Sequence, residues 1–530
     1  MTRKPVISAA EAATLVPDGA VLSVSSSSGL GCPDAVLQAI GERFAARGTP
    51  RGLTTLHPIA AGDMYGIKGI DHLAQPGLLR RVLAGSYPSG PSSLEPPLIR
   101  KLIEAEEIEA YNLPSGVLFQ MHRCAATRQP GVLTMVGLDT FVDPRREGGR
   151  MNAVTPEFVR VEQFDGREWL YYPAIPVDVA VIRGTTADEN GNITMEDEGS
   201  PLGALDQALA ARSNGGIVIA QVKRLALAGS LPAQQVRVPG VLVDHVVIDP
   251  DQLQTTQIDH DPALAGSLRR PLTEVEPAEF GLDKIIARRA AMELTQGAVV
   301  NLGFGISALV PRVLLEEGRH SEVTWVIEQG AIGGFPLTGF AFGCSLNPEA
   351  ILASADQFSF LQSGGFDTAM LSFLEIDAEA NANASALPGR SHVTAGVGGF
   401  ADITANARHL VFSGFFTAGR RDIDIEDGRL RLTADGEIPK LVDTVRQVTF
   451  SGRQALANGQ SVTVVTERCV MRLRPQGLTV TEVAPGIDLR RDVLERAAFP
   501  LQVSPDLTVM DARLFRPGPL GLQLHPRSAS

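Results

Sequence analysis

Residues 323–334 read Val-Thr-Trp-Val-Ile-Glu-Gln-Gly-Ala-Ile-Gly-Gly, an apolar run that stops at one acid and continues into glycines. The run is rich in β-branched and aromatic residues, which predicts a buried strand with Glu328 at the point where it leaves its sheet. Ligands of open α/β sheets bind at this edge, and glycines let a ligand approach the backbone. Most acids in such a position are solvated or ion-paired, but Glu328 is also a candidate nucleophile for a covalent acyl intermediate.

Two stretches of the chain predict the same order of elements. In the first, Ser8 is a plausible N-cap for a helix, residues 20–24 then predict a strand, and a loop of small residues over 25–31 leads to a helix that begins near Pro33. An apolar stripe predicts a helix over 282–294, and residues 298–302 then predict a strand that ends in another glycine turn.

The repeat continues with two polar turns. Residues 188–194 follow one strand-like run, and residues 377–383 follow another. Two related, doubly wound open α/β domains in one chain are the economical explanation, although similar turns also arise by chance. We therefore expect an N-terminal domain over 1–250, a linker over 251–281 that crosses the surface, and a C-terminal domain over 282–530.

Composition narrows the classes of function. A chain of 530 residues is too long for one core, and its net charge of −13 argues against broad binding of nucleic acid or of acidic membranes. The four cysteines form no CxxC pair, so we expect buried, reduced thiols. Neither an apolar leader nor a membrane-length apolar run is evident, so a cytoplasmic protein is expected.

The sequence contains no recognisable metal-binding motif and no complete nucleotide-binding motif. A phosphate-binding G-x-x-x-x-G-K-[ST] loop is missing, and the glycine pairs at 29–31 and 303–305 lack the third glycine of the dinucleotide motif. The nine histidines have no metal-ligand spacing. No metal is therefore expected, whereas an anionic co-substrate remains compatible with local arginines.

Several predicted loops follow Glu328 along the chain, and most of them are rich in glycine. They are Gly333-Gly334, a predicted turn into a helix at Asn347–Ala350, Gly364-Gly365 before a strand, and residues 396–399 before residues 401–404. If these loops meet at one sheet edge, their backbone N–H groups line a slot for a thin, flexible ligand.

These segments, in this order, resemble the family I CoA-transferases. The resemblance extends over nearly the whole chain and also includes Asn112-Leu113-Pro114, Val136-Gly137-Leu138, residues 140–149, Thr466-Glu467-Arg468 and residues 484–488. The chain most resembles the long, single-chain acetate or propionate CoA-transferase branch (acyl-CoA:acetate/3-ketoacid CoA-transferases), in which both family domains are fused.

The resemblance implies roles for individual residues. Glu328 matches the glutamate that forms the enzyme–CoA thioester, Gly399 the backbone donor of the oxyanion hole, and Asn301 a polar residue beside the glutamate. The family commonly has Gln where this chain has Ser115, so a shorter hydroxyl replaces an amide donor at a catalytic position. The loops implied in binding CoA contain Gly364, Gly365, Gly396, Gly398, Gly399 and Phe400.

The implied reaction moves CoA between a short-chain acyl-CoA and a free carboxylic acid by a ping-pong mechanism through a glutamyl-CoA thioester at Glu328. CoA is then a co-substrate, no cofactor is tightly bound, and the setting is short-chain fatty acid or ketone body metabolism. Family members commonly form homodimers or homotetramers. Two alternatives remain open, namely an acyl-CoA thioester hydrolase that uses the same glutamate and a non-catalytic acyl-CoA-binding protein.

Overall fold

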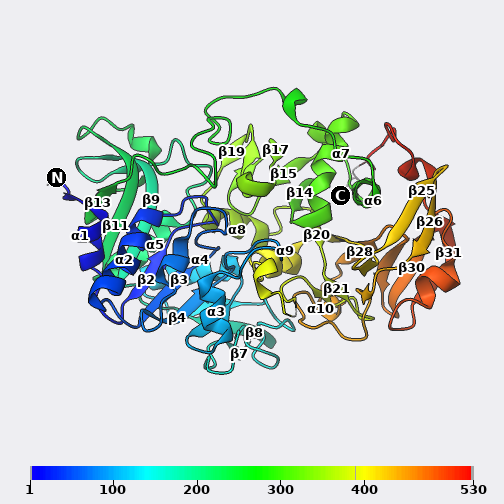
Figure 1. The fold of residues 1–530 in the computed structure, drawn as a ribbon, viewed down its shortest axis with the longest axis horizontal. Coiled ribbons are helices and arrows are strands. Elements are labelled where there is room, and N and C mark those ends of the chain that lie inside the picture. The colour runs from blue at the N-terminus through cyan, green and yellow to red at the C-terminus, as the bar shows by residue number, and fades with distance from the viewer. Residues whose placement is uncertain (1–2, 388, 527–530) are drawn as a thin grey trace. The chain divides into compact units, whose positions relative to one another are not determined.

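The computed structural model describes residues 3–387 and 389–526. The chain forms two compact units, and each unit contains segments that lie far apart in the sequence (Figure 1). The first unit consists of Met1–Arg270, Ile327–Ser359 and Leu387–Asp402, and the second of Pro271–Val326, Phe360–Ala386 and Ile403–Ser530. The domain boundaries expected at 250 and 282 stay a prediction.

The first unit is built on a parallel sheet. The strands follow one another across it as β1 (Val6–Ile7), β13 (His245–Ile248), β11 (Ile217–Ala226), β9 (Val179–Asp188), β2 (Val21–Val24), β3 (Leu53–His57), β4 (Leu79–Ala84) and β5 (Glu109–Asn112). Two short strands extend it with antiparallel pairing, β10 (Ile193–Thr194) and β12 (Val236–Val238). The smaller strands are β6 (Gly131–Thr134), β7 (Arg160–Phe164), β8 (Arg167–Pro173), β16 (Ala331–Ile332), β17 (Phe335–Pro336), β18 (Ser345–Leu346) and β19 (Ala350–Ile351).

Helices cover both faces of this sheet. They are α1 (Ala9–Thr14), α2 (Asp34–Arg47), α3 (Leu98–Glu104), α4 (Ser115–Ala126), α5 (Ala204–Ser213) and the 3-10 helix η1 (Gly69–Leu73). The N-cap predicted at Ser8 is confirmed and is part of a capping box, because the Ser8 hydroxyl accepts the Glu11 N–H and the Glu11 side chain accepts the Ser8 N–H.

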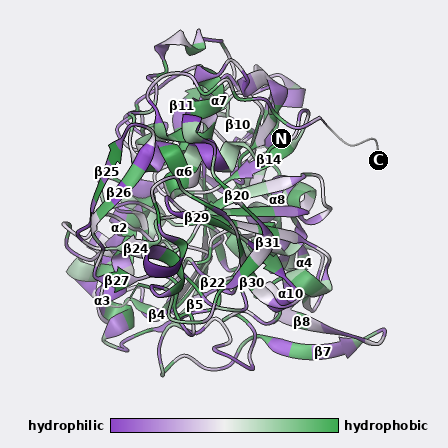
Figure 2. Ribbon diagram, turned by 90° about the vertical axis from the view of Figure 1, so that its right-hand side faces the viewer, coloured by the Kyte–Doolittle hydropathy of each residue, from purple (hydrophilic) through white to green (hydrophobic). Residues whose placement is uncertain are grey.

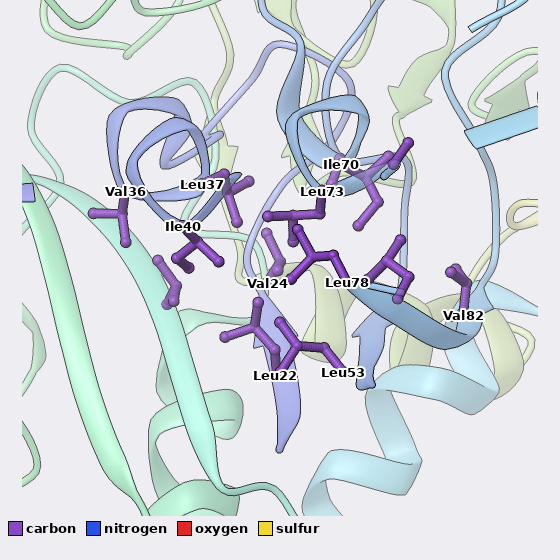
Figure 3. Close-up of a cluster of buried hydrophobic side chains, with 14 of the residues drawn as sticks. Leu22, Val24, Val36, Leu37, Ile40, Leu53, Ile70, Leu73, Leu78 and Val82 are labelled. Atoms are coloured by element: carbon purple, nitrogen blue, oxygen red, sulfur yellow. The ribbon is translucent and has the colours of Figure 1, made fainter. Parts of the chain in front are cut away.

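Successive side chains of β2 point to opposite faces of the sheet, and each face is covered by helices. Leu22 and Val24 face one side, where Figure 3 shows them beside Val36, Leu37 and Ile40 of α2. The intervening Ser23 faces the other side and lies 2.8 Å from Nε2 of His122 on α4. The doubly wound α/β class expected from the sequence is confirmed in this unit.

The second unit repeats this plan and adds an antiparallel edge. The strands follow as β15 (Thr324–Val326), β14 (Val299–Leu302), β20 (Thr368–Ser372), β23 (His409–Ser413), β28 (Ser461–Val465), β29 (Cys469–Arg474), β30 (Gly477–Val483) and β31 (Gln502–Val509), with parallel pairing as far as β28. Its helices are α6 (Leu282–Ala291), α7 (Val310–Glu316), α10 (Gly452–Ala457) and the 3-10 helix η4 (Gly305–Leu309), while α8 (Ser354–Gln362) and α9 (Phe400–Asn406) cross the boundary between the units along the chain. Short strands are β21 (Glu375–Ile376), β22 (Ala382–Asn383), β24 (Thr417–Ala418) and β27 (Ile438–Pro439), and β25 (Asp422–Glu426) with β26 (Arg429–Ala434) forms a hairpin that alternates hydrophilic and hydrophobic residues (Figure 2).

Matching hydrogen bonds show that the two units are related. The strand β2 begins where Asp178 accepts the Val21 N–H at 2.8 Å, and β14 begins where Asp367 accepts the Val299 N–H at 2.9 Å. The two polar turns predicted from the sequence also match. Each turn begins with an aspartate, Asp188 in the first and Asp377 in the second. The side chain of this aspartate accepts the backbone N–H groups of the residues two and four positions later.

Three local expectations are wrong. Asn347–Ala350 does not lead directly into a helix, because Ala350 and Ile351 pair with β16 as a strand and α8 begins only at Ser354. The helix predicted over 282–294 ends at Ala291. The expected surface linker is partly buried over 252–256, where amide side chains donate to backbone carbonyls, for example from Gln252 to Gly184 at 2.9 Å.

The structure also describes the cysteines and the lengths of the helices. The four cysteines are free and buried, as expected. Within residues 3–387 and 389–526, none of the helices is both long enough and apolar enough to cross a membrane.

Candidate active site

Glu328 lies in a tight turn two residues after the end of β15. The Gly330 N–H donates to the Ile327 carbonyl at 2.9 Å, and the Ile327 N–H donates to the Ala331 carbonyl at 2.9 Å. Gly330 has a φ of 140°, and a Cβ there would overlap the Leu352 carbonyl oxygen. The turn therefore requires glycine, and it holds the Glu328 backbone in one place.

The surroundings of Glu328 disfavour its charged form. Its pKa is raised from 4.5 to about 7, first because burial removes water and second because the charge of Asp402 lies nearby. Hydrogen bonds from the Gln329 side chain, at 3.2 Å, and from the Gly399 N–H act in the opposite direction. A carboxylate that is poorly solvated, and whose charged form is still populated near neutral pH, is suited to act as a nucleophile.

Gly399 has no room for a side chain. A Cβ there would overlap Oε2 of Glu328 and would lie 2.9 Å from Cε1 of Phe358. The missing side chain lets the Gly399 N–H reach the Glu328 carboxylate. Backbone donors held this close to a reacting carbonyl stabilise an oxyanion.

Neighbouring segments fix the glycine loop at 396–399. Asn112 lies at the end of β5, and its Oδ1 accepts the Val397 N–H at 2.8 Å. The Gly398 N–H donates to the Gly85 carbonyl at 2.7 Å, and the Gly398 carbonyl accepts the Ser115 N–H at 2.9 Å. Three segments distant in sequence thus position the donor of Gly399.

Gln329 anchors the other side of the turn. Its carbonyl accepts hydrogen bonds from the hydroxyls of Ser200 and Ser354, the latter at 2.7 Å. Its side chain donates to Glu328 and, at 3.3 Å, to Ser27. Within the described residues its buried Oε1 has no hydrogen-bond partner, so an acceptor is available beside Glu328.

Asp402 is the second carboxylate of the site. It is fully buried in the first turn of α9, and its Oδ2 accepts the Gly116 N–H at 2.9 Å near the N-terminus of α4. The positive end of a helix attracts a carboxylate, so the N-terminus of α4 favours an acid at this position.

Ser115 is the first residue of α4 and is fully buried. Its hydroxyl donates to the Pro58 carbonyl at 2.7 Å, and its N–H holds Gly398. The hydroxyl is therefore already used as a donor in this structure, and it supports the glycine loop through its backbone.

The remaining predicted residues are distributed between the two units. Gly396 belongs to the glycine loop and Phe400 begins α9. In the second unit, Asn301 is buried on β14 and donates to the Val326 carbonyl at 3.0 Å, while Gly364 and Gly365 form the turn after α8. Their predicted roles at Glu328 remain proposals.

Three residues that contact Glu328 or the loop of Gly399 did not appear among the predicted site residues, namely Asn112, Gln329 and Asp402. All three occur in the quoted motifs, so membership of those motifs was the available signal. No group of three or more His, Cys, Asp or Glu side chains suited to a metal occurs in the part of the chain that is described.

Comparisons with known proteins place the chain in a family. Residues 6–249 match the family described as Coenzyme A transferase. The chain is 42% identical over 515 residues to the caffeate CoA-transferase of Acetobacterium woodii, covering 96% of this chain and 97% of that protein. It is 40% identical over 537 residues to the acetate CoA-transferase YdiF of Escherichia coli K12, covering 98% and 97%.

Solved structures of CoA-transferases have the same fold as this chain. The apoenzyme of the acyl-CoA transferase YdiF from Escherichia coli O157:H7 superposes with a TM-score of 0.91 at 38% identity, covering 99% of this chain and 98% of that one. A structure of the same enzyme described as a thioester complex with CoA gives a TM-score of 0.90. The chain therefore belongs to the family I CoA-transferases and is a CoA-transferase.

Proposed function

We propose that the enzyme moves CoA between a short-chain acyl-CoA and a free carboxylic acid through a glutamyl-CoA thioester at Glu328. The observation that carries this proposal is the raised pKa of a carboxylate that also accepts the Gly399 N–H. Desolvation makes the carboxylate more reactive than in water, and positioning supplies effective concentration.

The first covalent step forms an anhydride. An oxygen of the Glu328 carboxylate attacks the thioester carbonyl carbon, the carbon–sulfur bond breaks, and CoA leaves as the thiolate. The thiolate then attacks the glutamyl carbonyl carbon and expels the first acid as its carboxylate, which leaves glutamyl-CoA. The Gly399 N–H, which donates to the Glu328 carboxylate, would stabilise the oxyanion at the glutamyl carbonyl.

The second half reverses these steps with another acid. The incoming carboxylate attacks the glutamyl-CoA carbonyl, the thiolate leaves, and it attacks the acyl carbon of the new anhydride. The new acyl-CoA departs and Glu328 is a carboxylate again. Ser115 supports this chemistry by holding Gly398, and Asn301 acts as a polar neighbour of the glutamate.

The proposal names a class of acceptor acids and not a single acid. Relatives named for acetate and caffeate support a monocarboxylic acid as the acceptor, and acetate is the first to test. We further infer a cytoplasmic homodimer or homotetramer with CoA as co-substrate.

Trapping the intermediate tests the proposal. The enzyme is incubated with acetyl-CoA, treated with borohydride, and its intact mass and peptides are measured. We expect the CoA adduct before reduction and the reduced alcohol at Glu328 afterwards. The variant Glu328→Gln removes both, whereas Glu349→Gln, which removes an exposed acid of the same segment, keeps them.

Two results would contradict the proposal. One is exchange of labelled acyl groups by Glu328→Gln at the wild-type rate. The other is steady turnover of acetyl-CoA that is the same with and without a carboxylic acid acceptor, which would indicate a hydrolase instead.

A further inference from the structure

The hairpin of β7 and β8 gives the first unit an unpaired strand edge. Its three-stranded sheet has the order β6-β8-β7, and within residues 3–387 and 389–526 β7 pairs with β8 alone. The hairpin lies at the periphery of this unit in both views (Figure 1 and Figure 2). The backbone groups on the outer side of such a strand are available to pair with another strand.

The turn of the hairpin determines which backbone groups face outward. Two residues, Asp165-Gly166, join the strands, and both have positive φ, 51° and 72°, as a type I′ turn requires. In such a hairpin the closing residues, Phe164 and Arg167, bond to each other, and every second residue before Phe164 also bonds to β8. The N–H and C=O groups of Val161 and Gln163 therefore point to the outer edge.

The edge strand β31 of the second unit is protected in ways that β7 is not. Pro505 lies within β31 and removes a backbone N–H, and the pairing of β31 with β30 shifts register between Val480 and Glu482. Proline and irregular pairing are two means by which proteins prevent association through sheet edges. The five residues of β7 contain no proline and pair with β8 without a shift.

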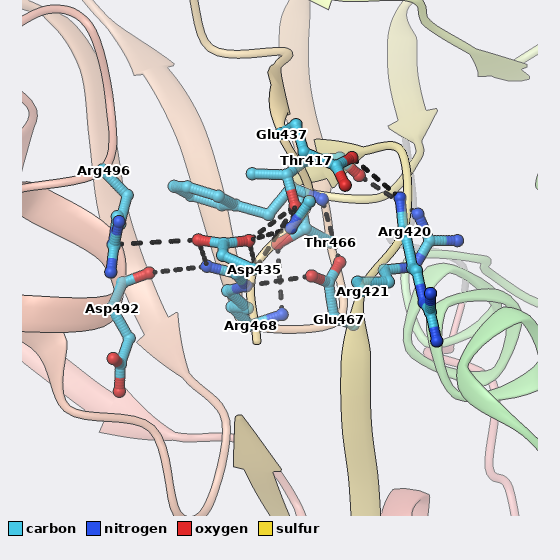
Figure 4. A network of polar contacts seen from close by, with 12 residues as sticks. Thr417, Arg420, Arg421, Asp435, Glu437, Thr466, Glu467, Arg468, Asp492 and Arg496 are labelled. Atoms are coloured by element: carbon cyan, nitrogen blue, oxygen red, sulfur yellow. Dashed lines mark hydrogen bonds and ion pairs between the residues drawn. The ribbon is translucent and has the colours of Figure 1, made fainter. Parts of the chain in front are cut away.

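Two opposite charges lie on one face of β7. The side chains of Arg160 and Glu162 are 62% and 48% exposed, and their nearest nitrogen and oxygen are 3.9 Å apart. Elsewhere the chain neutralises an arginine internally, since the buried Arg468 pairs with Asp435 and, at 3.0 Å, with Glu467 (Figure 4). The two charges of β7 are held far more loosely, so they can pair with charges on another strand.

We propose that β7 pairs antiparallel with β7 of a second copy of this chain, about a two-fold axis at Val161. The outward groups of Val161 then bond to those of the second copy's Val161, and the sheets join in the order β6-β8-β7-β7-β8-β6. Arg160 of each copy lies opposite Glu162 of the other, and these close positions favour opposite charges.

The charges select this register over its neighbours. Outward groups also meet when the axis is moved by one residue in either direction. With the axis at Arg160 the two arginines face each other, and with the axis at Glu162 the two glutamates do, and like charges directly opposite are destabilising. The chosen register also places the 62% exposed Phe164 against residues 156–159 of the second copy. The assignment rests on the homo-oligomer proposed above and not on the glutamyl intermediate.

Charge reversal at two positions tests the pairing. Glu162→Arg and Arg160→Glu each place like charges opposite one another twice, so each should raise the dissociation constant about 10-fold or more and halve the mass found by sedimentation velocity. The double variant should recover the wild-type mass, and so should an equimolar mixture of the two single variants, because their charges complement each other. The control Arg431→Glu reverses an arginine of another exposed hairpin, which also has a nearby glutamate, and should leave the mass unchanged.

A backbone variant tests the same edge without changing a charge. Gln163→Pro removes an N–H that points outward, so it should also halve the mass while the melting temperature changes little. Wild-type mass in both charge-reversal variants would overturn the assignment and leave the proposed oligomer intact, whereas a monomeric wild type would overturn both. Halved masses that neither the double variant nor the mixture restores would count against the pairing, because the loss would then not follow charge. Exchange between acetyl-CoA and labelled acetate reports separately on the chemistry of Glu328.

Discussion

Glu328→Gln should stabilise the enzyme while abolishing its activity, and the gain in stability should depend on pH. The wild-type carboxyl group has a pKa raised from 4.5 to about 7 in the folded protein. Ionising it therefore costs more in the folded state than in the unfolded state. The Gln side chain cannot ionise, and its oxygen still accepts the Gly399 N–H.

The size and sign follow from this shift. At pH 4 the group is protonated in both states, so the wild type and the variant should have similar stability. As pH rises from 4.5 to 7, the folded wild type binds more protons than the unfolded chain and loses stability relative to the variant. A shift of this size corresponds to about 3 kcal/mol above pH 7, and partial exposure of Glu328 to water reduces it to about 1–3 kcal/mol.

Thermal unfolding of both proteins between pH 4 and 8 measures the effect. The difference in Tm should be near zero at pH 4 and reach a few degrees in favour of Glu328→Gln at pH 8. Glu349→Gln serves as the control, because this exposed acid should give no pH-dependent difference. A constant difference across the range, or a less stable Gln variant at pH 8, would refute the electrostatic account of Glu328.

Three further changes probe the same site. Asp402→Asn should move the pH midpoint of kcat/KM to a lower value, because Asp402 raises the pKa of Glu328 and the carboxylate is the reactive form; a midpoint that does not move in a pH titration of initial rates would exclude this role. Gly399→Ala should lower kcat by about 10²–10³-fold with little loss of secondary structure by circular dichroism, because its Cβ would overlap Oε2 of Glu328. Ser115→Gln should lower Tm, because overpacking this buried position costs about 1–3 kcal/mol, and should alter acyl preference; unchanged kcat/KM with every acyl donor would show that the position does not face the reaction.

Local patterns in the sequence were sufficient to predict the repeated α/β plan. The strands at 21–24 and 299–302 and the polar turns that begin at Asp188 and Asp377 depend on residues near one another in the chain. The error at 347–350 has a different origin. Ala350 becomes a strand because it pairs with Ile332, and a window around 350 contains no information about that partner.

The linker shows the same limitation. Polar residues over 252–256 predict an exposed segment, yet their side chains satisfy buried carbonyls such as that of Gly184 on β9. A polar residue is stable inside a protein when it is hydrogen-bonded, and composition alone does not reveal the partner.

The site was predictable to the extent that its chemistry lies in contiguous motifs. Glu328 and Gly399 each occur at the end of a recognisable pattern, but the residues that tune them come from distant parts of the chain. Asp402 accepts the N–H of Gly116, which precedes it by 286 residues. Asn112 holds the loop of Gly399 from a similar separation of 285 residues.

Asp402 favours the proposed acylation of Glu328, because it raises the energy of the ionised carboxylate. Burial and the charge of Asp402 both disfavour ionised Glu328. In the proposed mechanism, conversion of Glu328 to an anhydride or a thioester removes its charge, so the repulsion from Asp402 would disappear in the covalent states. The destabilisation therefore favours acylation, provided that enough Glu328 is ionised at the working pH. A pKa of about 7 keeps a large fraction ionised, whereas a higher pKa would increase the driving force but deplete the reactive form.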